Sequence, residues 1–307
     1  MKRRDIILAL LLIVIWGGNF TVIKLGVSGV PSMLLIALRY MLTAFPAVFF
    51  IKKPNISLKH FLLYSLNVGV LQFACLFYSM QIGMPASLSS IITQLQAFIS
   101  PLLACYVLKE KIKTKQITGI IIAGLGLIVI GVASNSNGLS NIPPIALILA
   151  ISAPVFWSIS NIIARIASEK AIEKGERLNM FSLVVWSGLI PPIPMLTLSL
   201  IIDKPQTIIN VVTHLSPISI FAILYLAYGA TLFGYGFWSV LITKYPISKV
   251  SPLTLMVPVI GLLTARIVLK EYLTPMQWLG AFIILIGLII TNIDFKLIKN
   301  KFKVTEH

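Results

Sequence analysis

The sequence predicts an all-α membrane protein in which ten transmembrane helices form two inverted five-helix repeats. Three observations support this fold class: an apolar composition, ten apolar stretches long enough to cross a bilayer, and an internal repeat. Hydrophobic residues make up 58% of the 307 positions and charged residues only 11%, whereas soluble domains carry about 25% charged residues. With a mean hydropathy of +0.97, the chain cannot cover itself with a polar surface. The composition therefore argues against a soluble enzyme, a disordered protein and a nucleic-acid-binding domain.

A transmembrane helix needs about 20 predominantly apolar residues, and the chain contains ten such stretches. The break between the third and the fourth is only Gly83-Met84-Pro85. We expect the spans near residues 6–26, 33–51, 61–82, 86–108, 117–134, 143–164, 180–202, 217–241, 247–269 and 276–294.

The basic residues indicate the orientation of these spans. A ten-helix topology places 20 of the 25 Lys and Arg residues on one side of the membrane, whereas the opposite loops hold only Lys204 and Lys270. Cytoplasmic loops carry an excess of Lys and Arg, so we expect both termini in the cytoplasm. The basic segments are the N-terminus, 52–60, 109–116, 165–178, 242–249 and the tail after 295.

An internal repeat divides the chain into two parts. Residues 86–131 align with residues 247–292 without a gap, at an offset of 161, and 16 of the 46 positions are identical. The clearest match is Val-Leu-Lys-Glu, which begins at Val107 and again at Val268. We therefore expect a first five-helix repeat at 1–137 and a second at 138–307, the latter ending in a short basic tail.

Five is an odd number, so the second repeat must enter the membrane inverted relative to the first. Inverted repeats are typical of carriers that hold a substrate near the bilayer midplane, between the two halves. A duplication kept only for packing, a channel or receptor, and an intramembrane enzyme are the alternatives. The enzyme is disfavoured because no His, Asp or Glu lies well inside a span, which leaves little for acid–base or metal chemistry.

Several motifs match a known family along most of the chain. They are Ile15-Trp16-Gly17-Gly18-Asn19-Phe20, Ile23-Lys24, Ala44-Phe45-Pro46-Ala47, Gly83-Met84-Pro85-Ala86, Gln94-Leu95-Gln96-Ala97-Phe98, Ser182-Leu183-Val184-Val185-Trp186-Ser187, Gly234-Tyr235-Gly236, Pro252-Leu253 and Val257-Pro258-Val259. With these motifs the chain resembles the EamA family of the drug/metabolite transporter superfamily, and within it the bacterial exporters of O-acetylserine and cysteine. The resemblance implies export of cysteine-pathway amino-acid metabolites across the cell inner membrane. Related exporters share much of this pattern, so other amphipathic metabolites or drugs are the alternative substrates.

Polar side chains near the middle of the spans are the first candidates for a substrate pathway, because such groups are costly in a bilayer unless they face protein or water. Trp16 and Asn19 lie one turn apart in the first span, and Trp157 and Asn161 repeat this pattern in the second half. Equivalent polar groups in both halves suit a site at the repeat interface. In the alternative interpretation, Trp fills a cavity and Asn ties two helices together.

Helical periodicity supplies further candidates. Gln96 shares one face of the fourth span with other polar residues, whereas Gln94, which belongs to the family motif, lies about 200° from it at 3.6 residues per turn. We therefore expect only one of these two glutamines to face a pathway. Tyr78 and Tyr235 belong to aromatic stripes on the third and eighth spans; packing is the alternative role of such stripes. The three stripes are Ser89, Thr93, Gln96 and Ser100; Tyr64, Asn67, Cys75 and Tyr78; and Tyr225, Tyr228, Tyr235 and Ser239.

Three cations lie within spans: Lys24, Arg39 and Arg266. Lys and Arg near span ends snorkel to the interface, which suits Arg266 and is one of two readings of Lys24. Arg39 lies about 9–10 Å deep at 1.5 Å per residue. It is the best candidate for a buried functional cation, and either a substrate carboxylate or Glu271 or backbone carbonyls could pair with it.

The sequence predicts no cofactor and no metal. It contains no G-x-x-x-x-G-K-[ST] motif, so ATP is not expected as a direct energy source. Cys75 and Cys105 have no metal-ligand or disulfide spacing. The expected partners are a small-molecule substrate of the cysteine-pathway amino-acid type and membrane lipid, with no nucleic acid, and the chain acts as a monomer or homodimer.

Overall fold

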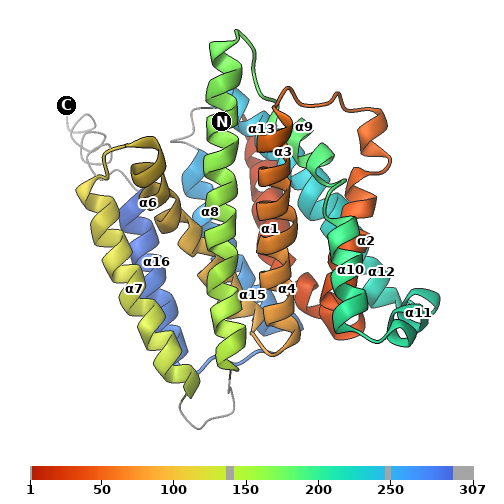
Figure 1. Cartoon of the computed structure of the whole chain (residues 1–307). Helices are drawn as coiled ribbons and strands as arrows, with labels where there is room; N and C mark the ends of the chain where they lie inside the picture. The colour runs from red at the N-terminus through yellow and green to blue at the C-terminus, as the bar shows by residue number, and fades with distance from the viewer. Residues whose placement is uncertain (1, 136–141, 246–249, 293–307) are drawn as a thin grey trace.

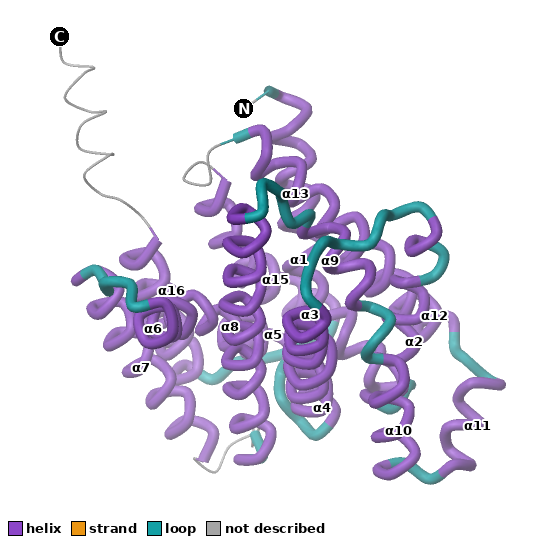
Figure 2. Tube along the Cα trace, turned by 45° about the horizontal axis from the view of Figure 1, so that its top comes forward, coloured by secondary structure: helices purple, strands orange, loops and turns teal. Residues whose placement is uncertain are grey.

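The computed structural model describes residues 2–135, 142–245 and 250–292, and within these ranges every regular element is helical. Figure 1 shows a bundle of helices that run roughly along one direction. Figure 2 shows α6, α7 and α16 gathered on one side of the bundle and α10, α11 and α12 on the other. The division expected at 137/138 lies outside the described residues.

The first half of the chain contains the elements up to α7. Two apolar helices of this half are interrupted. The π-helical segment η2 separates α3 from α4, and the 3₁₀ turn η3 separates α5 from α6. The bounds are α1 Arg3–Gly29, α2 Ser32–Ala44, η1 Ala47–Phe49, α3 Leu58–Ser65, η2 Leu66–Gln72, α4 Phe73–Gln81, α5 Ala86–Ile92, η3 Thr93–Leu95, α6 Gln96–Leu108 and α7 Thr114–Asn135.

The second half follows the same plan, with a π-helical segment, η4, in its third apolar helix. A short extra helix, α11, connects α10 to α12. The bounds are α8 Pro144–Glu173, α9 Met180–Ser187, α10 Pro192–Ile202, α11 Pro205–Thr213, α12 Pro217–Leu224, η4 Tyr225–Phe233, α13 Gly234–Lys244, η5 Ser251–Met256, α15 Val257–Val268 and α16 Pro275–Asn292.

The lengths of these helices suit a membrane. Among the described residues, seven helical stretches are long and apolar enough to cross a bilayer, and three shorter apolar helices accompany them. Each overlaps one of the predicted spans. The beginning of the span expected at 247–269 and the end of that at 276–294 lie outside the described residues.

One predicted boundary is wrong. We expected the sixth span to end at residue 164 and to be followed by a basic loop, but α8 continues to Glu173. Nothing between the two points breaks a helix, and Arg165 binds Glu169 one turn further on, at 3.2 Å. The chain leaves the helix at Gly175, whose φ of +75° is a conformation that glycine adopts at no steric cost.

The π-helical segments η2 and η4 occupy matching places, because each interrupts the third apolar helix of its half. A π-helix closes its hydrogen bonds from residue i to i+5, and such turns are frequent at functional sites. Within η4 the hydroxyl of Thr231 donates to the carbonyl of Leu226, five residues back, at 2.8 Å. In the α-helix α2, the Thr43 hydroxyl instead bonds to the carbonyl of Arg39, four residues back.

Glycines allow α7 and α16 to pack closely. A Cβ at Gly119 would lie 2.9 Å from the carbonyl oxygen of Gly287, and one at Gly126 would lie 2.7 Å from that of Gly280. Small residues permit this close approach of helices in membranes. Because the partner number falls from 287 to 280 as the α7 number rises from 119 to 126, the two helices run antiparallel.

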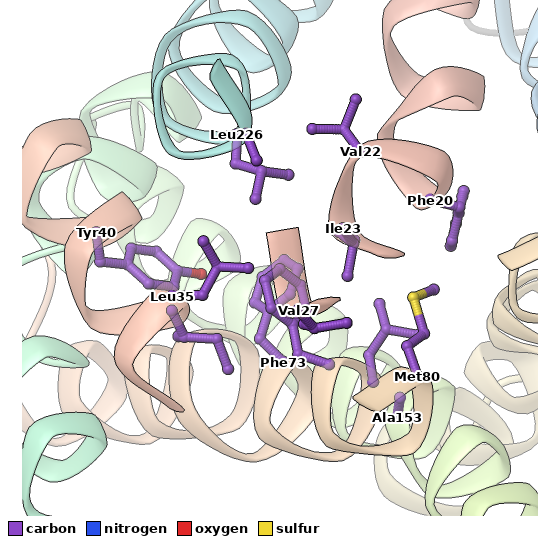
Figure 3. Close-up of a cluster of buried hydrophobic side chains, with 14 of the residues drawn as sticks. Phe20, Val22, Ile23, Val27, Leu35, Tyr40, Phe73, Met80, Ala153 and Leu226 are labelled. Carbon is purple, nitrogen blue, oxygen red and sulfur yellow. The ribbon is translucent and has the colours of Figure 1, made fainter. Parts of the chain in front are cut away.

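The main apolar core lies where α1, α2, α4 and η4 meet. Figure 3 shows Ile23, Leu35, Phe73 and Leu226, one from each of these elements, gathered in this core. Large apolar side chains are also exposed along the outer faces, for example Ile121 at 59% and Phe282 at 55%. An outer surface this apolar exceeds what soluble monomers expose and suits lipid.

Candidate functional site

A cavity of about 440 Å³ lies at the centre of the bundle, a volume within the range of small-molecule sites. Both halves of the chain line it, with α1, α2, η2 and α6 from the first half and α8, α9, α13 and η5 from the second. Its described lining residues include no Asp, Glu or His. The predicted site residues that line it are Trp16, Asn19, Arg39, Gln94, Gln96, Trp157, Asn161 and Tyr235.

Arg39 is the cation of this cavity. Its side chain is 3% exposed, and its Nη2 donates a hydrogen bond of 2.8 Å to the hydroxyl of Thr231 in η4. Its Nε and Nη1 are buried and have no hydrogen-bond partner in the described part of the chain. The guanidinium carbon lies 4.3 Å from the ring centre of Phe73 and 5.0 Å from that of Tyr40. Aromatic faces thus support a charge that has no carboxylate partner among the described residues.

The alternative in which Arg39 pairs with Glu271 is wrong. The Glu271 carboxylate accepts hydrogen bonds from the backbone N–H of Ala86 at 2.8 Å, from that of Ser87 at 3.0 Å and from the Ser87 hydroxyl at 2.6 Å. These groups form the beginning of α5, where an acidic side chain satisfies free N–H groups and complements the helix dipole.

The tryptophan and asparagine pairs occupy different environments in the two halves. Trp16 donates from Nε1 to the carbonyl of Ala230 at 3.1 Å, and its ring lies 5.7 Å from Tyr235 and 5.6 Å from Trp238. The Oδ1 of Asn19 is buried and has no partner within the described ranges. In the second half, Asn161 donates to the Oε1 of Gln96 at 3.3 Å. Asn161 therefore lines the cavity and also connects α8 to α6. Asn19 lines the cavity too, but its Oδ1 forms no such bond within the described ranges.

Both Gln94 and Gln96 line the cavity, contrary to the expectation that only one could face it. That expectation assumed a regular helix across residues 86–108. The structure instead divides this span into α5, the 3₁₀ turn η3 and α6. Since η3 contains Gln94 and α6 begins at Gln96, the angle of about 200° calculated for a continuous α-helix does not apply.

Lys24 does not line the cavity. Its ammonium donates to the carbonyl of Met80 at 2.6 Å and to that of Met84 at 3.0 Å. These carbonyls belong to the end of α4 and the turn that follows, where a cation is favourable because the last carbonyls of a helix lack partners. Lys24 therefore binds protein groups instead of snorkelling or lining the cavity.

Tyr78 also lies outside the cavity lining and is half-buried against the apolar core. The stripe that included it assumed 3.6 residues per turn. Because η2 is π-helical, its wider turn rotates the residues within and after it relative to a regular α-helix, and the third span lines the cavity with Tyr64, Val68, Gln72 and Leu76. Gln72 was missed for the same reason. No pattern in the sequence signals the wider turn.

The cavity extends toward the end of the bundle where the chain begins. Met180 and Ile242, at the start of α9 and near the end of α13, line it at that end. Figure 1 shows the N-terminus, α9 and α13 at the same end, and α4 reaching the opposite one. The opposite end holds the contacts of Glu271 and Lys24 and a bond of 2.7 Å from the Ser32 N–H to the Gln81 Oε1.

A bundle of membrane-spanning helices around a central cavity lined from both halves defines a membrane transport protein. The chain belongs to the EamA-like transporter family, which it matches over residues 3–132 and 144–293. It is a transporter and not an enzyme, and it is a multi-pass membrane protein.

Individual relatives extend the comparison. The chain is 40% identical over 290 residues to a protein of Escherichia coli (strain K12) named "Probable amino-acid metabolite efflux pump", covering 94% of this chain and 95% of that one. A protein of Salmonella typhimurium (strain LT2) with the same name is 40% identical over 296 residues, covering 96% and 97%. A solved structure titled "Crystal structure of protein" matches with a TM-score of 0.59 and 13% identity, over 95% of this chain and 98% of that one. This likeness concerns the fold alone.

Proposed function

We propose that the protein exports small amino-acid metabolites of the O-acetylserine and cysteine type across the bacterial inner membrane, and that the central cavity holds them during transport. The substrate is a carboxylate, and Arg39 is its partner. The observation that carries this proposal is the buried guanidinium with two unpartnered nitrogens in the described part of the cavity wall. An isolated buried charge is costly unless it is paired, so a substrate carboxylate is the natural counterion.

Alternating access between two inverted five-helix repeats is the proposed mechanism. The antiparallel contact of α7 and α16 supports the inversion, because these are the last helices of the two halves and their glycines at matching positions meet reciprocally. Lys109 and Lys270, which match at the offset of 161, both have left-handed backbones, with φ of 57° and 53°. With ten spans and both termini in the cytoplasm, the cavity extends toward the cytoplasm, where an export substrate loads.

The proposed boundary between repeats stays at 137/138, and the proposed assembly is a monomer or a homodimer. Transport through this cavity requires no cofactor. Export of other amphipathic metabolites or drugs is the second candidate, because aromatic side chains such as Trp16, Tyr235 and Trp238 form a large part of the wall. A neutral amphipathic compound would make no use of Arg39.

The test is uptake of L-cysteine and O-acetyl-L-serine into inverted membrane vesicles. Charge-assisted hydrogen bonds contribute about 1.5–3 kcal/mol, so Arg39→Gln should lower Vmax/KM by about 10-fold to 100-fold. Arg266→Gln is the matched control, because Arg266 is exposed and stacks on Tyr272 at 3.7 Å, away from the cavity. Unchanged cysteine uptake by Arg39→Gln would contradict the proposal. Transport of neutral amphipathic compounds alone, indifferent to Arg39, would support the second candidate.

A further inference from the structure

Two oxygen acceptors in the same cavity are left without donors. The Oε1 of Gln72 and the Oδ1 of Asn19 are buried and have no hydrogen-bond partner among the residues that the structure describes. Gln72 is only 4% exposed, and both side chains line the cavity together with Arg39. Native proteins seldom leave buried polar groups unsatisfied, and each such group needs an explanation.

The unsatisfied groups form a complementary set. Arg39 offers two donor nitrogens, Nε and Nη1, on a cation, and Gln72 and Asn19 offer two acceptor oxygens on neutral amides. A carboxylate has only acceptors and an ammonium group has only donors. A ligand that carries both groups on one carbon atom, an α-amino acid with a free amino group, offers a counterpart to each set.

The surroundings of Asn19 also suit an ammonium group. Trp16 lies one helical turn before Asn19, and its ring packs beside Tyr235 and Trp238, at 5.7 and 5.6 Å between ring centres. Aromatic faces attract cations. The described cavity lining contains no carboxylate, so the ammonium group is recognised by hydrogen bonds and aromatic faces and not by an ion pair.

We propose that Gln72 and Asn19 bind the free α-ammonium group of the substrate while Arg39 binds its carboxylate, so that the carrier selects unblocked α-amino acids over N-acylated or amine-free carboxylates. This inference rests on the proposed function and adds a selectivity that Arg39 alone does not provide.

The experiment compares four thiols in proteoliposomes that contain the full-length protein under reducing conditions. L-Cysteine has both charged groups, N-acetyl-L-cysteine and 3-mercaptopropanoate keep only the carboxylate, and cysteamine keeps only the ammonium group. Hydrogen bonds to charged groups are strong enough for a preference of about tenfold or more. We expect Vmax/KM for L-cysteine to exceed that for 3-mercaptopropanoate and for N-acetyl-L-cysteine by at least this factor.

Two variants assign the preference to Gln72. Gln72→Leu should reduce the ratio of L-cysteine to 3-mercaptopropanoate about tenfold, and Gln72→Glu should raise it, because a carboxylate attracts the ammonium group and repels the amine-free acid. Asn19→Asp should raise the ratio likewise. Ser89→Ala is the control, since the Ser89 hydroxyl is also buried and unpartnered among the described residues but lies outside the cavity lining, and it should leave the ratio unchanged.

The possible failures are distinguishable. Equal transport of L-cysteine and 3-mercaptopropanoate by the unmodified protein would overturn this inference and leave the carboxylate site intact. A wild-type preference that none of the Gln72 and Asn19 variants changes would overturn the assignment of these residues. Should Gln72→Leu be absent from the membrane, the two acidic variants still decide the question. Absence of uptake for every carboxylate, or full activity of Arg39→Gln, would instead overturn the proposed function.

Discussion

Replacement of Arg39 by methionine should make the empty protein at least as stable while it abolishes cysteine transport. Methionine is apolar, flexible and of similar volume, so it can pack against Phe73 and Tyr40 in the space of the arginine side chain. The substitution leaves no new unsatisfied partner, because the Thr231 hydroxyl still donates to the carbonyl of Leu226 at 2.8 Å. The substitution should therefore lower the stability of the protein if Arg39 has a structural role, and should keep or raise it if Arg39 serves to bind the ligand.

The magnitude follows from the contacts of the guanidinium. Keeping one charge in a protein interior costs several kcal/mol. One charge-assisted hydrogen bond returns about 1.5–3 kcal/mol, and each cation–π contact returns about 0.5–2 kcal/mol. Apolar replacements of buried charged groups are often neutral or stabilising by about 1–4 kcal/mol. We expect Arg39→Met to be more stable by between zero and about 3 kcal/mol, which corresponds to a rise in Tm of at most about 6 °C at roughly 2 °C per kcal/mol.

The assay is thermal unfolding of the purified protein in detergent, with and without L-cysteine. The ligand should raise the Tm of the wild type in a saturable way and should not change that of Arg39→Met. Arg266→Met provides the control for loss of a cation elsewhere. If Arg39→Met unfolds several degrees below the wild type, Arg39 is a structural residue and the reasoning fails.

Three further predictions concern topology, closure and energy. With Cys75 and Cys105 replaced by serine, an impermeant thiol reagent applied to intact cells should label Gly138→Cys but not Ile112→Cys; the reverse pattern would end the proposed orientation. Glu271→Ala removes three hydrogen bonds from the beginning of α5. The rate at which a thiol reagent labels a cavity cysteine from the extracellular side should therefore rise about tenfold or more. An unchanged labelling rate would show that these contacts do not hold that end closed. Downhill L-cysteine flux in proteoliposomes should be saturable and insensitive to a proton ionophore, because the described cavity lining has no Asp, Glu or His to carry a proton. Steep uphill accumulation of L-cysteine driven by a pH gradient would refute this prediction. Lys24 would then be the first residue to mutate.

Hydropathy and periodicity predicted the parts of this fold that depend on composition. Each of the expected apolar stretches overlaps a helix because a bilayer requires continuous apolar length, whatever the contacts between helices. The sequence also indicated the central polar groups of both halves, since Trp16 and Asn19 have counterparts in Trp157 and Asn161. Burial of a polar residue near the middle of a span can be predicted without knowing its neighbours.

The errors about which residues of the third and fourth spans line the cavity have a common physical cause, which is departure from the regular α-helix. The π-helical segment η2 puts Gln72 on the cavity face and leaves Tyr78 outside it, and the 3₁₀ turn η3 lets Gln94 and Gln96 line the same space. The partners of Lys24 could not be predicted either, because Met80 and Met84 lie 56 and 60 residues away and offer backbone carbonyls. Any residue type presents a carbonyl, so the sequence carries no signal of such a partner.

The π-helical segment η4 has a consequence for the charge in the cavity. Thr231 is the hydrogen-bond partner of Arg39, and its hydroxyl is oriented by a bond five residues back, to Leu226, instead of four residues back. If η4 tightened to α-helical winding, the hydroxyl would turn toward residue 227 and away from its present direction. The winding of one helix in the second half thus sets the local environment of a cation carried by the first half. A change in the winding of η4 would therefore move the hydroxyl that holds the guanidinium.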